Sequence, residues 1–442
     1  MTEVSSAEDL EDAVNAAAPG DMVIVTAGRY SGHLDIEGQG TRESPVTIRA
    51  ERQGSVGWEG PVTLKGNYLS LEGFVFGLES SVTIAEGTGH RILRCEFNAL
   101  RAGHWVRIDD EATRCEIGYC SFTHDDNSQE IKGQQVVQVR RSDASGPDHH
   151  WIHHNYFAEI SRGGSSNGFE TIQLHQGKVR GRGSSQTLIE YNYFERCNGE
   201  PEIISVKCSD NVIRHNVFVE CQGMLTFRNG HGNTAVGNVF FGSGVAGTGG
   251  IRFQGRDQTV INNYMEGLTA SAISLHDGDP DDKYERVEDA TIAFNTIVNC
   301  ALGLTVGLRY TSKSTEPPLR VVLANNLFAC PEGSLVHSPD NDLSTWTISG
   351  NIYSGHALGI PDPGGFRYED LLLVALPGGI QVPQQGSPAI GGAEGDFPGV
   401  VEDIFGLPRP VSGKDVGAAQ VSAPLLPVSP IGVGPDAAMS AP

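Results

Sequence analysis

Two glutamates spaced two residues apart are the first feature of this chain that suggests chemistry. Glu200 and Glu202 are followed by a single lysine, Lys207, and Arg228 comes 21 residues after that lysine. Side chains at positions i and i+2 of a strand point to the same face, about 6 to 7 Å apart, so these carboxylates are placed to converge on one hard cation. A cation, an amine and a guanidinium together make a site that removes a proton beside a carboxylate. The alternative is an exposed strand with an ion pair, and the choice depends on the rest of the chain.

A recurring hydrophobic-x-x-Asn-x-hydrophobic unit predicts the architecture that positions these residues. The unit is spaced by 37, 24, 22, 25, 32, 31 and 25 residues, and it is centred on Asn155, Asn192, Asn216, Asn238, Asn263, Asn295, Asn326 and Asn351. Periods in the low twenties, with longer coils where loops are inserted, are typical of a parallel β-helix with about three short strands per coil. The leucine spacing of a leucine-rich horseshoe is absent. We interpret the asparagines as a hydrogen-bonded ladder at a coil corner.

The predicted fold is therefore all-β, a single right-handed parallel β-helix with an N-terminal capping helix and an irregular C-terminal cap. Residues 1–20 predict the capping helix, with Ser5 or Ser6 as its N-cap. Such a helix covers the open end of a solenoid, where core and strand edges would otherwise be exposed. Residues 21–420 are assigned to the β-helix, and residues 421–442 to a Pro-rich tail.

Counting from the ladder asparagine of each coil places the candidate residues at similar angular positions, in four successive coils about 4.8 Å apart. The offsets are +12 for Asn167, +8 for Glu200, +10 for Glu202, +15 for Lys207, +12 for Arg228 and +14 for Arg252. We therefore expect all six side chains to project from one side of the solenoid. Lys207 is an odd number of residues from Glu202, so a bend must lie between them if both face one groove.

These residue types suit an elimination reaction on a uronic acid. Glu200, Glu202 and Asn167 offer the hard oxygen ligands that Ca²⁺ prefers, with room left for water and a substrate carboxylate. A cation on that carboxylate acidifies the neighbouring C5 proton. Lys207 is then the candidate base for this proton.

The arginines suit the other half of such a reaction. Arg228 would stabilise the leaving glycosidic oxygen or deliver a proton through water, because arginine rarely gives up its own proton. Arg252 suits bidentate recognition of a neighbouring uronate carboxylate.

Three further clusters have more than one interpretation. A basic loop with Lys178, Arg180 and Arg182 would either wall a groove for an anionic chain or be solvated. An acidic loop resembles a calcium loop by composition but lacks the EF-hand pattern, which favours a solvated loop; it contains Asp277, Asp279, Asp281 and Asp282. Two histidine pairs are interpreted as alternating between groove and turn rather than as metal ligands; they are His149-His150 and His153-His154.

Composition and charge exclude several classes of partner. The net charge of −23 should repel nucleic acid and anionic membranes, and no run approaches the roughly 20 apolar residues of a membrane span. Residues 1–10 are polar and acidic, unlike an uncleaved secretory signal, so we expect either a mature secreted protein or an intracellular one. Most of the eight cysteines recur in repeat register, which favours buried stacking over disulfides. The sequence contains no C-x-x-C motif, so a zinc site is not expected.

Four short motifs follow one another in a characteristic order. They are NG-x-E at 167–170, GE-x-E-I-I-S-x-K at 199–207, L-T-x-R at 225–228 and GGIR at 249–252. In this order they resemble polysaccharide lyase family 6, which includes alginate lyases and chondroitinase B. The resemblance runs with gaps over about residues 5–420. It implies a parallel β-helix, β-elimination, a calcium ion and a secreted or periplasmic location. It also implies that Lys207 is the Brønsted base, Arg228 the acid, and Glu200, Glu202 and Asn167 the calcium ligands.

The chain departs from the family pattern beside these residues. Asn229 stands where the family usually has histidine, with His231 two residues later, and Gln173 stands where arginine is common. Val206 replaces an asparagine before the lysine. We expect Arg252, Gln173, Asn229 and His231 at substrate subsites, where these changes would alter specificity.

The leading hypothesis is a calcium-dependent lyase acting on a 1,4-linked uronate polysaccharide, with alginate as the first choice and dermatan or chondroitin as the second. A glycoside hydrolase on the same solenoid is an alternative, because Glu200 and Glu202 satisfy its carboxylate spacing of about 5 to 9.5 Å. A carbohydrate-binding solenoid without turnover is another. Sequence alone leaves open the preference for mannuronate or guluronate, endo or exo action, and the oligomeric state.

Overall fold

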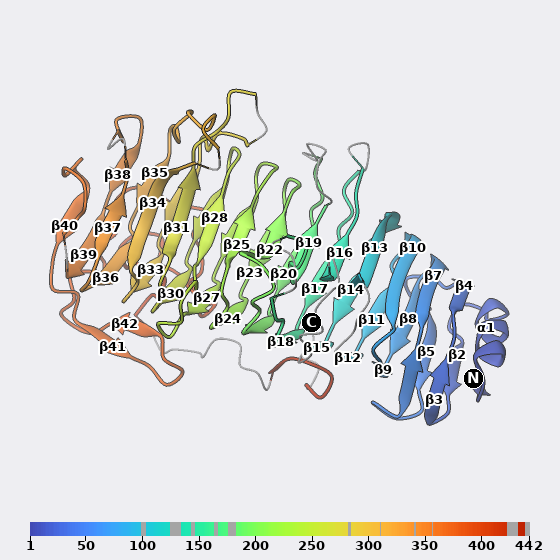
Figure 1. Ribbon diagram of the computed structural model, residues 1–442. Helices are drawn as coiled ribbons and strands as arrows, with labels where there is room; N and C mark the ends of the chain where they lie inside the picture. The colour runs from blue at the N-terminus through green and yellow to red at the C-terminus, as the bar shows by residue number, and fades with distance from the viewer. Residues whose placement is uncertain are drawn as a thin grey trace. The chain divides into compact units, whose positions relative to one another are not determined.

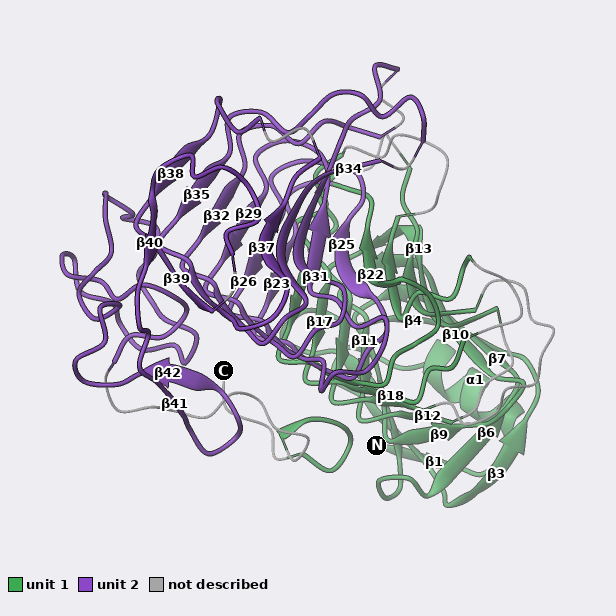
Figure 2. Ribbon diagram, turned by 60° about the vertical axis from the view of Figure 1, so that its left-hand side comes forward, with its two compact units in different colours: residues 1–208, 429–442 green, residues 209–428 purple. Residues whose placement is uncertain are grey.

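The computed structural model describes most of the chain, in the residue ranges 1–98, 103–123, 134–142, 146–162, 167–175, 183–281, 284–309, 311–339, 342–355, 357–421 and 432–437. The chain forms two compact units, coloured separately in Figure 2. Unit 1 comprises residues 1–208 and 429–442, and unit 2 comprises residues 209–428. Among the described residues, no helix is long and apolar enough to span a membrane.

Each unit is built from coils that contribute one strand to each of three parallel sheets, named here sheet A, sheet B and sheet C (Figure 1). In unit 1, sheet A contains β1 (Thr2–Val4), β2 (Met22–Val25), β5 (Val46–Ala50), β8 (Leu69–Glu72), β11 (Arg91–Leu93), β14 (Glu116–Gly118), β17 (Trp151–His153) and β20 (Leu188–Glu190). Sheet B contains β3 (Gly28–Ser31), β6 (Val56–Glu59), β9 (Phe74–Phe76), β12 (Glu96–Asn98), β15 (Ser121–Thr123), β18 (Tyr156–Ala158) and β21 (Tyr193–Glu195). Sheet C contains β4 (Leu34–Gln39), β7 (Pro61–Asn67), β10 (Ser81–Thr88), β13 (His104–Thr113), β16 (Gln135–Val139), β19 (Ile172–Leu174) and β22 (Glu202–Val206).

Unit 2 repeats the same order of strands. Its sheet A contains β23 (Val212–Arg214), β26 (Thr234–Val236), β29 (Thr259–Ile261), β32 (Thr291–Ala293), β35 (Val322–Ala324) and β38 (Thr347–Ser349). Its sheet B contains β24 (Val217–Val219), β27 (Val239–Phe241), β30 (Tyr264–Glu266), β33 (Thr296–Val298), β36 (Leu327–Cys330), β39 (Asn351–Gly355) and β40 (Phe366–Tyr368). Its sheet C contains β25 (Met224–Phe227), β28 (Ile251–Phe253), β31 (Ser271–His276), β34 (Leu302–Leu308) and β37 (Ser334–His337). The predicted all-β fold, a right-handed parallel β-helix, is confirmed.

The N-terminal helix lies where the sequence predicts it. Helix α1 (Ala7–Asn15) begins after Ser6, whose side chain accepts a hydrogen bond from the backbone N–H of Asp9 at 3.1 Å. Leu10 and Val14 on its inner face are fully buried. The helix packs against β4 and covers the first coils of unit 1 (Figure 1).

The recurrent asparagines form the predicted ladders. In unit 1, Asn155 Nδ2 donates to Asn192 Oδ1 at 3.0 Å, and the backbone N–H of Asn155 donates to the same oxygen. In unit 2 the same pairing continues from coil to coil through Asn216, Asn238, Asn263, Asn295, Asn326 and Asn351. The residue before each ladder asparagine is often left-handed, as at Tyr191 with φ 53°. Each amide therefore satisfies backbone groups that the corner leaves unpaired.

Aromatic and cysteine side chains fill the interior between the sheets. In unit 1 the rings of Phe97, Phe122, Phe157 and Phe194 stack with centroids 4.7 to 4.9 Å apart, one ring per coil of sheet B. All eight cysteines are buried free thiols, which confirms the expectation of stacking without disulfides.

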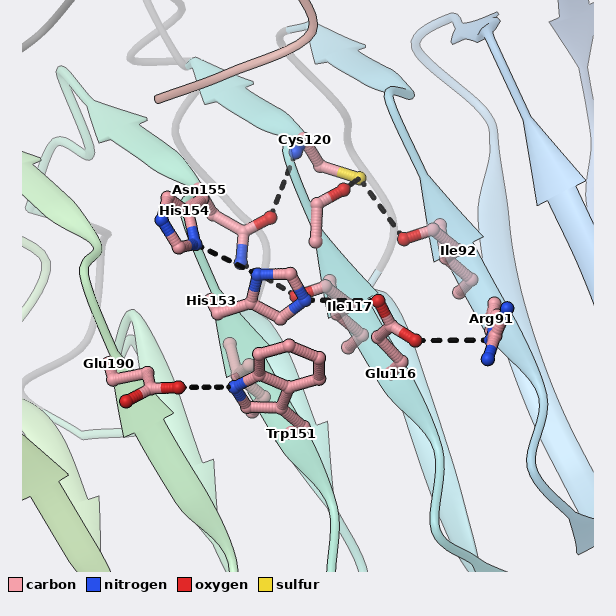
Figure 3. A network of polar contacts seen from close by, with 12 residues as sticks. Arg91, Ile92, Glu116, Ile117, Cys120, Trp151, His153, His154, Asn155 and Glu190 are labelled. Carbon is pink, nitrogen blue, oxygen red and sulfur yellow. Dashed lines mark hydrogen bonds and ion pairs between the residues drawn. The ribbon is translucent and has the colours of Figure 1, made fainter. Parts of the chain in front are cut away.

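The histidine pairs lie on and beside sheet A and outside the acidic site described below. His153 Nε2 lies 3.1 Å from Glu116 Oε1, and Arg91 Nε lies 3.1 Å from the other carboxylate oxygen (Figure 3). His154 occupies the following turn, where its ring stacks on Tyr119 and Tyr191. The turn position is confirmed for His154, whereas the groove position of the other histidine stays a prediction.

The C-terminal part of unit 2 forms the predicted irregular cap. After β40 it contains only a short antiparallel pair, β41 (Leu373–Ala375) and β42 (Gln381–Pro383), among its described residues. Ala389 and Val416 pack against Leu327 and Ile352 of the outer coils.

Six residues of the predicted tail, 432–437, belong to unit 1. There Arg94 Nη2 donates to the carbonyl of Ala437 at 2.7 Å, and the N–H of Gly434 donates to the carbonyl of His154 at 2.9 Å. Residues 422–431 and 438–442 lie outside the described residues, so the division of the chain at residues 20 and 420 stays a prediction.

Removal of one ladder amide tests the ladder. Asn295→Ala leaves the buried backbone N–H of Asn263 without its acceptor at 3.0 Å, which should lower the free energy of unfolding by about 1 to 3 kcal/mol. Urea unfolding followed by circular dichroism measures this. The matched control is Asn98→Ala, because Asn98 is exposed and outside the ladder; equal effects of the two changes would contradict the ladder's role.

Candidate active site

Three buried glutamates come together in unit 1. Glu170, Glu200 and Glu202 each offer a carboxylate oxygen, and these oxygens lie within 4.8 Å of one another. All three side chains are at most 5% exposed. Glu170 precedes β19, Glu200 lies in the turn before β22, and Glu202 begins β22. Two neighbouring coils therefore build one acidic cluster.

A close approach of these two coils positions Glu200. One of its oxygens accepts hydrogen bonds from the backbone N–H groups of Gly168 at 2.6 Å and Phe169 at 3.2 Å. Gly199 packs so tightly there that an added Cβ would lie 2.2 Å from the carbonyl oxygen of Phe169. The glycine before the first glutamate of the motif is thus required by space.

The electrostatics of the cluster favour a cation. Burial, together with the charges of Glu170 and Glu202, raises the pKa of Glu200 to about 7, although the hydrogen bonds from Phe169 and Gly168 oppose this shift. Three carboxylates this close are stabilised when a cation shares their oxygens. Oxygen-only ligands are the set that Ca²⁺ and Mg²⁺ prefer, so the residues present fit a hard divalent ion.

Lys207 stands at the edge of the acidic cluster. Its Nζ lies 3.3 Å from Oε1 of Glu170, and the residue is only 7% exposed. The bend that the sequence predicts between Glu202 and Lys207 stays a prediction, because all five residues of β22 are buried. The hydroxyl of Ser205 donates to the carboxylate of Glu202.

Glu170 also joins a chain of buried amides on sheet C. The side-chain amide of Gln173 donates to Glu170, and Gln138 donates to the oxygen of Gln173 at 3.0 Å. The hydrogen bond from Gln173 therefore helps to orient Glu170. The predicted role of Gln173 in substrate binding stays a prediction.

Unit 2 brings two arginines and a histidine together on its own sheet C. Arg252 of β28 is paired in register with Thr226 of β25 and Ser274 of β31, and Arg228 and His276 lie two residues beyond those partners. Burial lowers the pKa of His276 to about 3, with further lowering by the positive charges of Arg252 and Arg228. His276 is therefore a neutral imidazole beside two guanidinium groups.

His231 and Arg228 face residues of the segment 277–289. The Nδ1 of His231 accepts the backbone N–H of Arg256 at 3.1 Å, and its Nε2 lies 3.8 Å from Oε1 of Glu285. The guanidinium carbon of Arg228 lies over the ring of Tyr284, 5.8 Å from the ring centroid.

The acidic segment around Asp277 is only partly the solvated loop that its composition favours. Asp277, Asp279 and Glu285 are buried, at 0%, 1% and 4% exposure. Asp277 pairs with Arg309 at 3.0 Å, and Asp279 accepts the hydroxyl of Ser314 at 2.6 Å. Asp277 and Asp279 are buried because the next coil supplies their partners, which composition does not reveal, whereas Asp281 is 54% exposed as expected of a solvated loop.

The remaining predicted residues are placed less completely. Asn167 is exposed beside Gly168, and its role as a ligand stays a prediction. Asn229 is half-buried after Arg228. Whether the acidic cluster and the arginines share one groove also stays a prediction. Lys178, Arg180, Arg182 and Asp282 lie outside the described residues.

Sequence reasoning missed several residues that the structure adds. Glu170 completes the acidic cluster, and its signal was the last position of the NG-x-E motif. His276 and Tyr284 carried no such signal, because each lies beside an arginine only through the folding of a later coil.

Comparison with known proteins shows the family. The family model for chondroitinase B matches residues 4–395, while no curated protein sequence matches the chain. The solved structure of the PL6 family alginate lyase AlyGC is 29% identical with a TM-score of 0.78, covering 87% of this chain and 55% of its own. A mannuronic acid specific family 6 lyase from human gut microbiota is 26% identical with a TM-score of 0.72, covering 84% of this chain and 91% of its own.

A third solved structure, the PL6 family lyase Pedsa3628 from Pseudopedobacter saltans, shares the fold at 19% identity and a TM-score of 0.68, covering 99% of this chain and 100% of its own. The chain spans about half the length of AlyGC. Fold, acidic cluster and these likenesses define a class, the polysaccharide lyases built on a parallel β-helix. Within that class the chain belongs to the chondroitinase B family, polysaccharide lyase family 6, as its motifs predict.

The tight turn at Gly199 gives a test of the site's construction. Gly199→Ala should push the turn away from Phe169 and lower the free energy of unfolding by about 1 to 3 kcal/mol. If the cluster holds a hard divalent ion such as Ca²⁺, the change should also weaken its binding measured by calorimetry, because Glu200 moves with the turn. Gly146→Ala is the matched control, since nothing lies within 4 Å of its added Cβ; unchanged Ca²⁺ binding in Gly199→Ala would contradict this account.

Proposed function

We propose that this protein is a calcium-dependent lyase that cleaves a 1,4-linked uronate polysaccharide by β-elimination and leaves 4,5-unsaturated uronate ends. The observation that carries the proposal is the buried cluster of Glu170, Glu200 and Glu202 with Lys207 at its edge. Membership of the lyase family supports it.

The acidic cluster is the proposed metal site. Glu200 and Glu202 would hold Ca²⁺, with Asn167 as a third protein ligand and Glu170 beside them. When bound, the ion neutralises the substrate carboxylate and makes the C5 proton more acidic. The hydrogen bonds from Gly168 and Phe169 fix Glu200 before substrate arrives, so little reorganisation is needed on binding.

Lys207 is the proposed base. Its amine removes the C5 proton, the C5–H electron pair forms the C4–C5 double bond, and the bond from C4 to the glycosidic oxygen breaks. Because Lys207 is only 7% exposed and Glu170 holds its Nζ at 3.3 Å, few orientations are open to the amine. Lys207 thus meets the proton in a fixed position.

Arg228 is the proposed partner of the leaving oxygen, which it stabilises directly or supplies with a proton through a water molecule. Arg252 is placed one coil further on in unit 2 and would bind a neighbouring uronate carboxylate. That residues of both units act on one sugar is part of the proposal and rests on their offsets from the ladder asparagines.

Alginate is the proposed substrate. AlyGC is an alginate lyase, and the family 6 enzyme from human gut microbiota is mannuronic acid specific. Dermatan or chondroitin is the second choice, supported by the match to the chondroitinase B model. A secreted or periplasmic location is proposed with it, since such polymers lie outside the cytoplasm.

Two other functions explain less of the site. A hydrolase would use two of the clustered carboxylates but would give Lys207 and the arginines no role. A binding protein without turnover would not need a lysine held beside a metal site. Saturated products would indicate the hydrolase, and calorimetric binding without products would indicate the binding protein.

Loss of the base should abolish product formation. We expect Lys207→Ala to lower kcat on alginate by about 10²- to 10⁴-fold, the usual contribution of a positioned base. The ultraviolet absorbance of the new C4–C5 double bond measures this. Lys313→Ala is the control, because that side chain is 73% exposed. No absorbance from wild-type protein with alginate, dermatan or pectate in the presence of Ca²⁺ would refute the proposal.

Removal of the metal should affect stability as well as activity. Ca²⁺ at 100 times its Kd should stabilise the wild-type protein by about 2.7 kcal/mol, seen as a higher Tm, and a chelator should reverse both this gain and the activity. Glu202→Gln should remove the Ca²⁺-dependent rise in Tm, whereas the exposed control Glu37→Gln should keep it. If Ca²⁺ does not change the Tm of the wild-type protein, of Glu202→Gln or of Glu37→Gln, the proposed metal site is contradicted.

A further inference from the structure

A chain of hydrogen-bonded side chains crosses sheet C of unit 1 and ends at Arg140. Near the proposed base, Glu170 accepts hydrogen bonds from Lys207 at 3.3 Å and from Gln173 at 2.5 Å. Gln138 donates to Gln173 at 3.0 Å, and the Nε of Arg140 donates to Gln138 at 3.2 Å. Every link joins two side chains, so Arg140 and Lys207 lie on the same outer face of this sheet.

Arg140 and Lys207 hold equivalent places in coils that are two apart. Val139 of β16 is paired in register with Leu174 of β19, which is paired in turn with Val206 of β22. Arg140 directly follows the first of these three residues, and Lys207 directly follows the last. Paired parallel strands lie about 4.8 Å apart, so the two positions are separated along the solenoid by about twice that spacing.

Arg107 and Arg140 share one carboxylate, that of Asp109. Arg107 Nη2 donates to Asp109 Oδ2 at 3.0 Å, and its Nε lies 2.8 Å from Oδ1. Arg140 Nη1 lies 3.8 Å from the same Oδ1, which is beyond hydrogen-bond distance. These three side chains together therefore carry one positive charge in excess, in a protein whose net charge is −23.

The surroundings of Arg140 suit a ligand better than a structural role. Its side chain is 39% exposed, and an ion pair so long and so exposed contributes little to stability. Its Nη2 has no hydrogen-bond partner among the residues that the structure describes. A guanidinium with free donors binds a carboxylate through parallel N–H groups. An anionic oxygen from outside the protein would complete this arrangement.

A separation of two coils matches the geometry of a 1,4-linked uronate chain. One pyranose ring advances an extended chain by about the spacing of one coil, and successive rings are turned over. The carboxylates of every second sugar therefore point the same way. A chain that lies along the solenoid with one sugar at Lys207 thus presents a further carboxylate near Arg140.

We infer that Arg140 is a substrate-binding residue, and that it holds the carboxylate of the sugar two positions away from the one that Lys207 deprotonates. This inference rests on the proposed function, because the sugars are counted from the reacting uronate. It extends the proposed site of unit 1 by two coils, from β22 to β16. Alginate and dermatan both carry a uronate at that position, so the carboxylate is the chemistry that they share.

Kinetics on oligosaccharides of different length, with the full-length chain and Ca²⁺ present, test this. Arg140→Gln should raise KM for an alginate hexasaccharide about 10- to 100-fold, the effect of losing a hydrogen bond between charged groups. It should leave kcat within about threefold, because a distant sugar is bound equally in the ground state and the transition state. On a disaccharide, which is too short to reach Arg140, the variant and the wild-type protein should agree.

Arg91→Gln is the matched control. Arg91 is also paired with one carboxylate, at 3.1 Å, and its side chain is 42% exposed, but it belongs to sheet A. It should behave as wild type on every substrate. Both variants should keep the wild-type Tm, which excludes lost folding as the cause of a raised KM.

Binding without turnover separates a failure of this inference from a failure of the proposed function. In the Lys207→Ala protein, calorimetry with the hexasaccharide should show a Kd that Arg140→Gln raises about 10- to 100-fold and that Arg91→Gln does not change. Unchanged KM and Kd in Arg140→Gln would overturn the inference and leave the lyase proposal intact. Equal losses in Arg140→Gln and Arg91→Gln would also overturn it, because they would indicate attraction by overall charge.

Absence of unsaturated product from the wild-type protein would refute the proposed function. The comparison of Kd values would then still decide whether Arg140 binds a uronate carboxylate.

Discussion

The spacing between paired parallel strands is the constraint on which this protein depends. Strands in one sheet lie about 4.8 Å apart, so side chains at the same register in neighbouring coils are held at contact distance. In unit 1 this places Gln173 beside Ser205, and in unit 2 it places Arg252 between Thr226 and Ser274. The asparagine ladders keep that register by satisfying the corners between strands. Chemistry on sheet C is therefore assembled one coil at a time, from residues distant in sequence.

The same spacing forces like charges together, and the fold must compensate for this. Three buried carboxylates in one cluster would be unfavourable by themselves, as the raised pKa of Glu200 shows. Backbone N–H groups, the Ser205 hydroxyl and the Lys207 side chain each donate a hydrogen bond to a carboxylate of this cluster. In unit 2 a neutral His276 lies near Arg228 and Arg252, and the ring of Tyr284 lies near Arg228.

Much of this arrangement could be predicted because it repeats. The period of the asparagines predicts the β-helix, and offsets from them select Glu200, Glu202 and Lys207 as neighbours. The role of Glu170 was harder to predict, since it depends on how far the turn at Gly199 approaches Phe169. The inward orientation of Asp277 and Asp279 could not be predicted, because their partners, Arg309 and Ser314, come from another coil's loop. The orientation of side chains in insertions is set by tertiary contacts rather than by the repeat. Acidic composition therefore predicts exposure for Asp277 and Asp279, although both are buried.

Insertions at the corners leave the ladder undisturbed. Asn155 and Asn192 are 37 residues apart in sequence, yet their amides remain in contact at 3.0 Å, as do those of Asn216 and Asn238, which are only 22 residues apart. Loop length and coil register are thus independent variables. Evolution can exchange or lengthen the peripheral loops of such a scaffold, and so change which sugars it accepts, without changing the register of the strands in the sheets. A protein engineer could graft loops between relatives on the same principle.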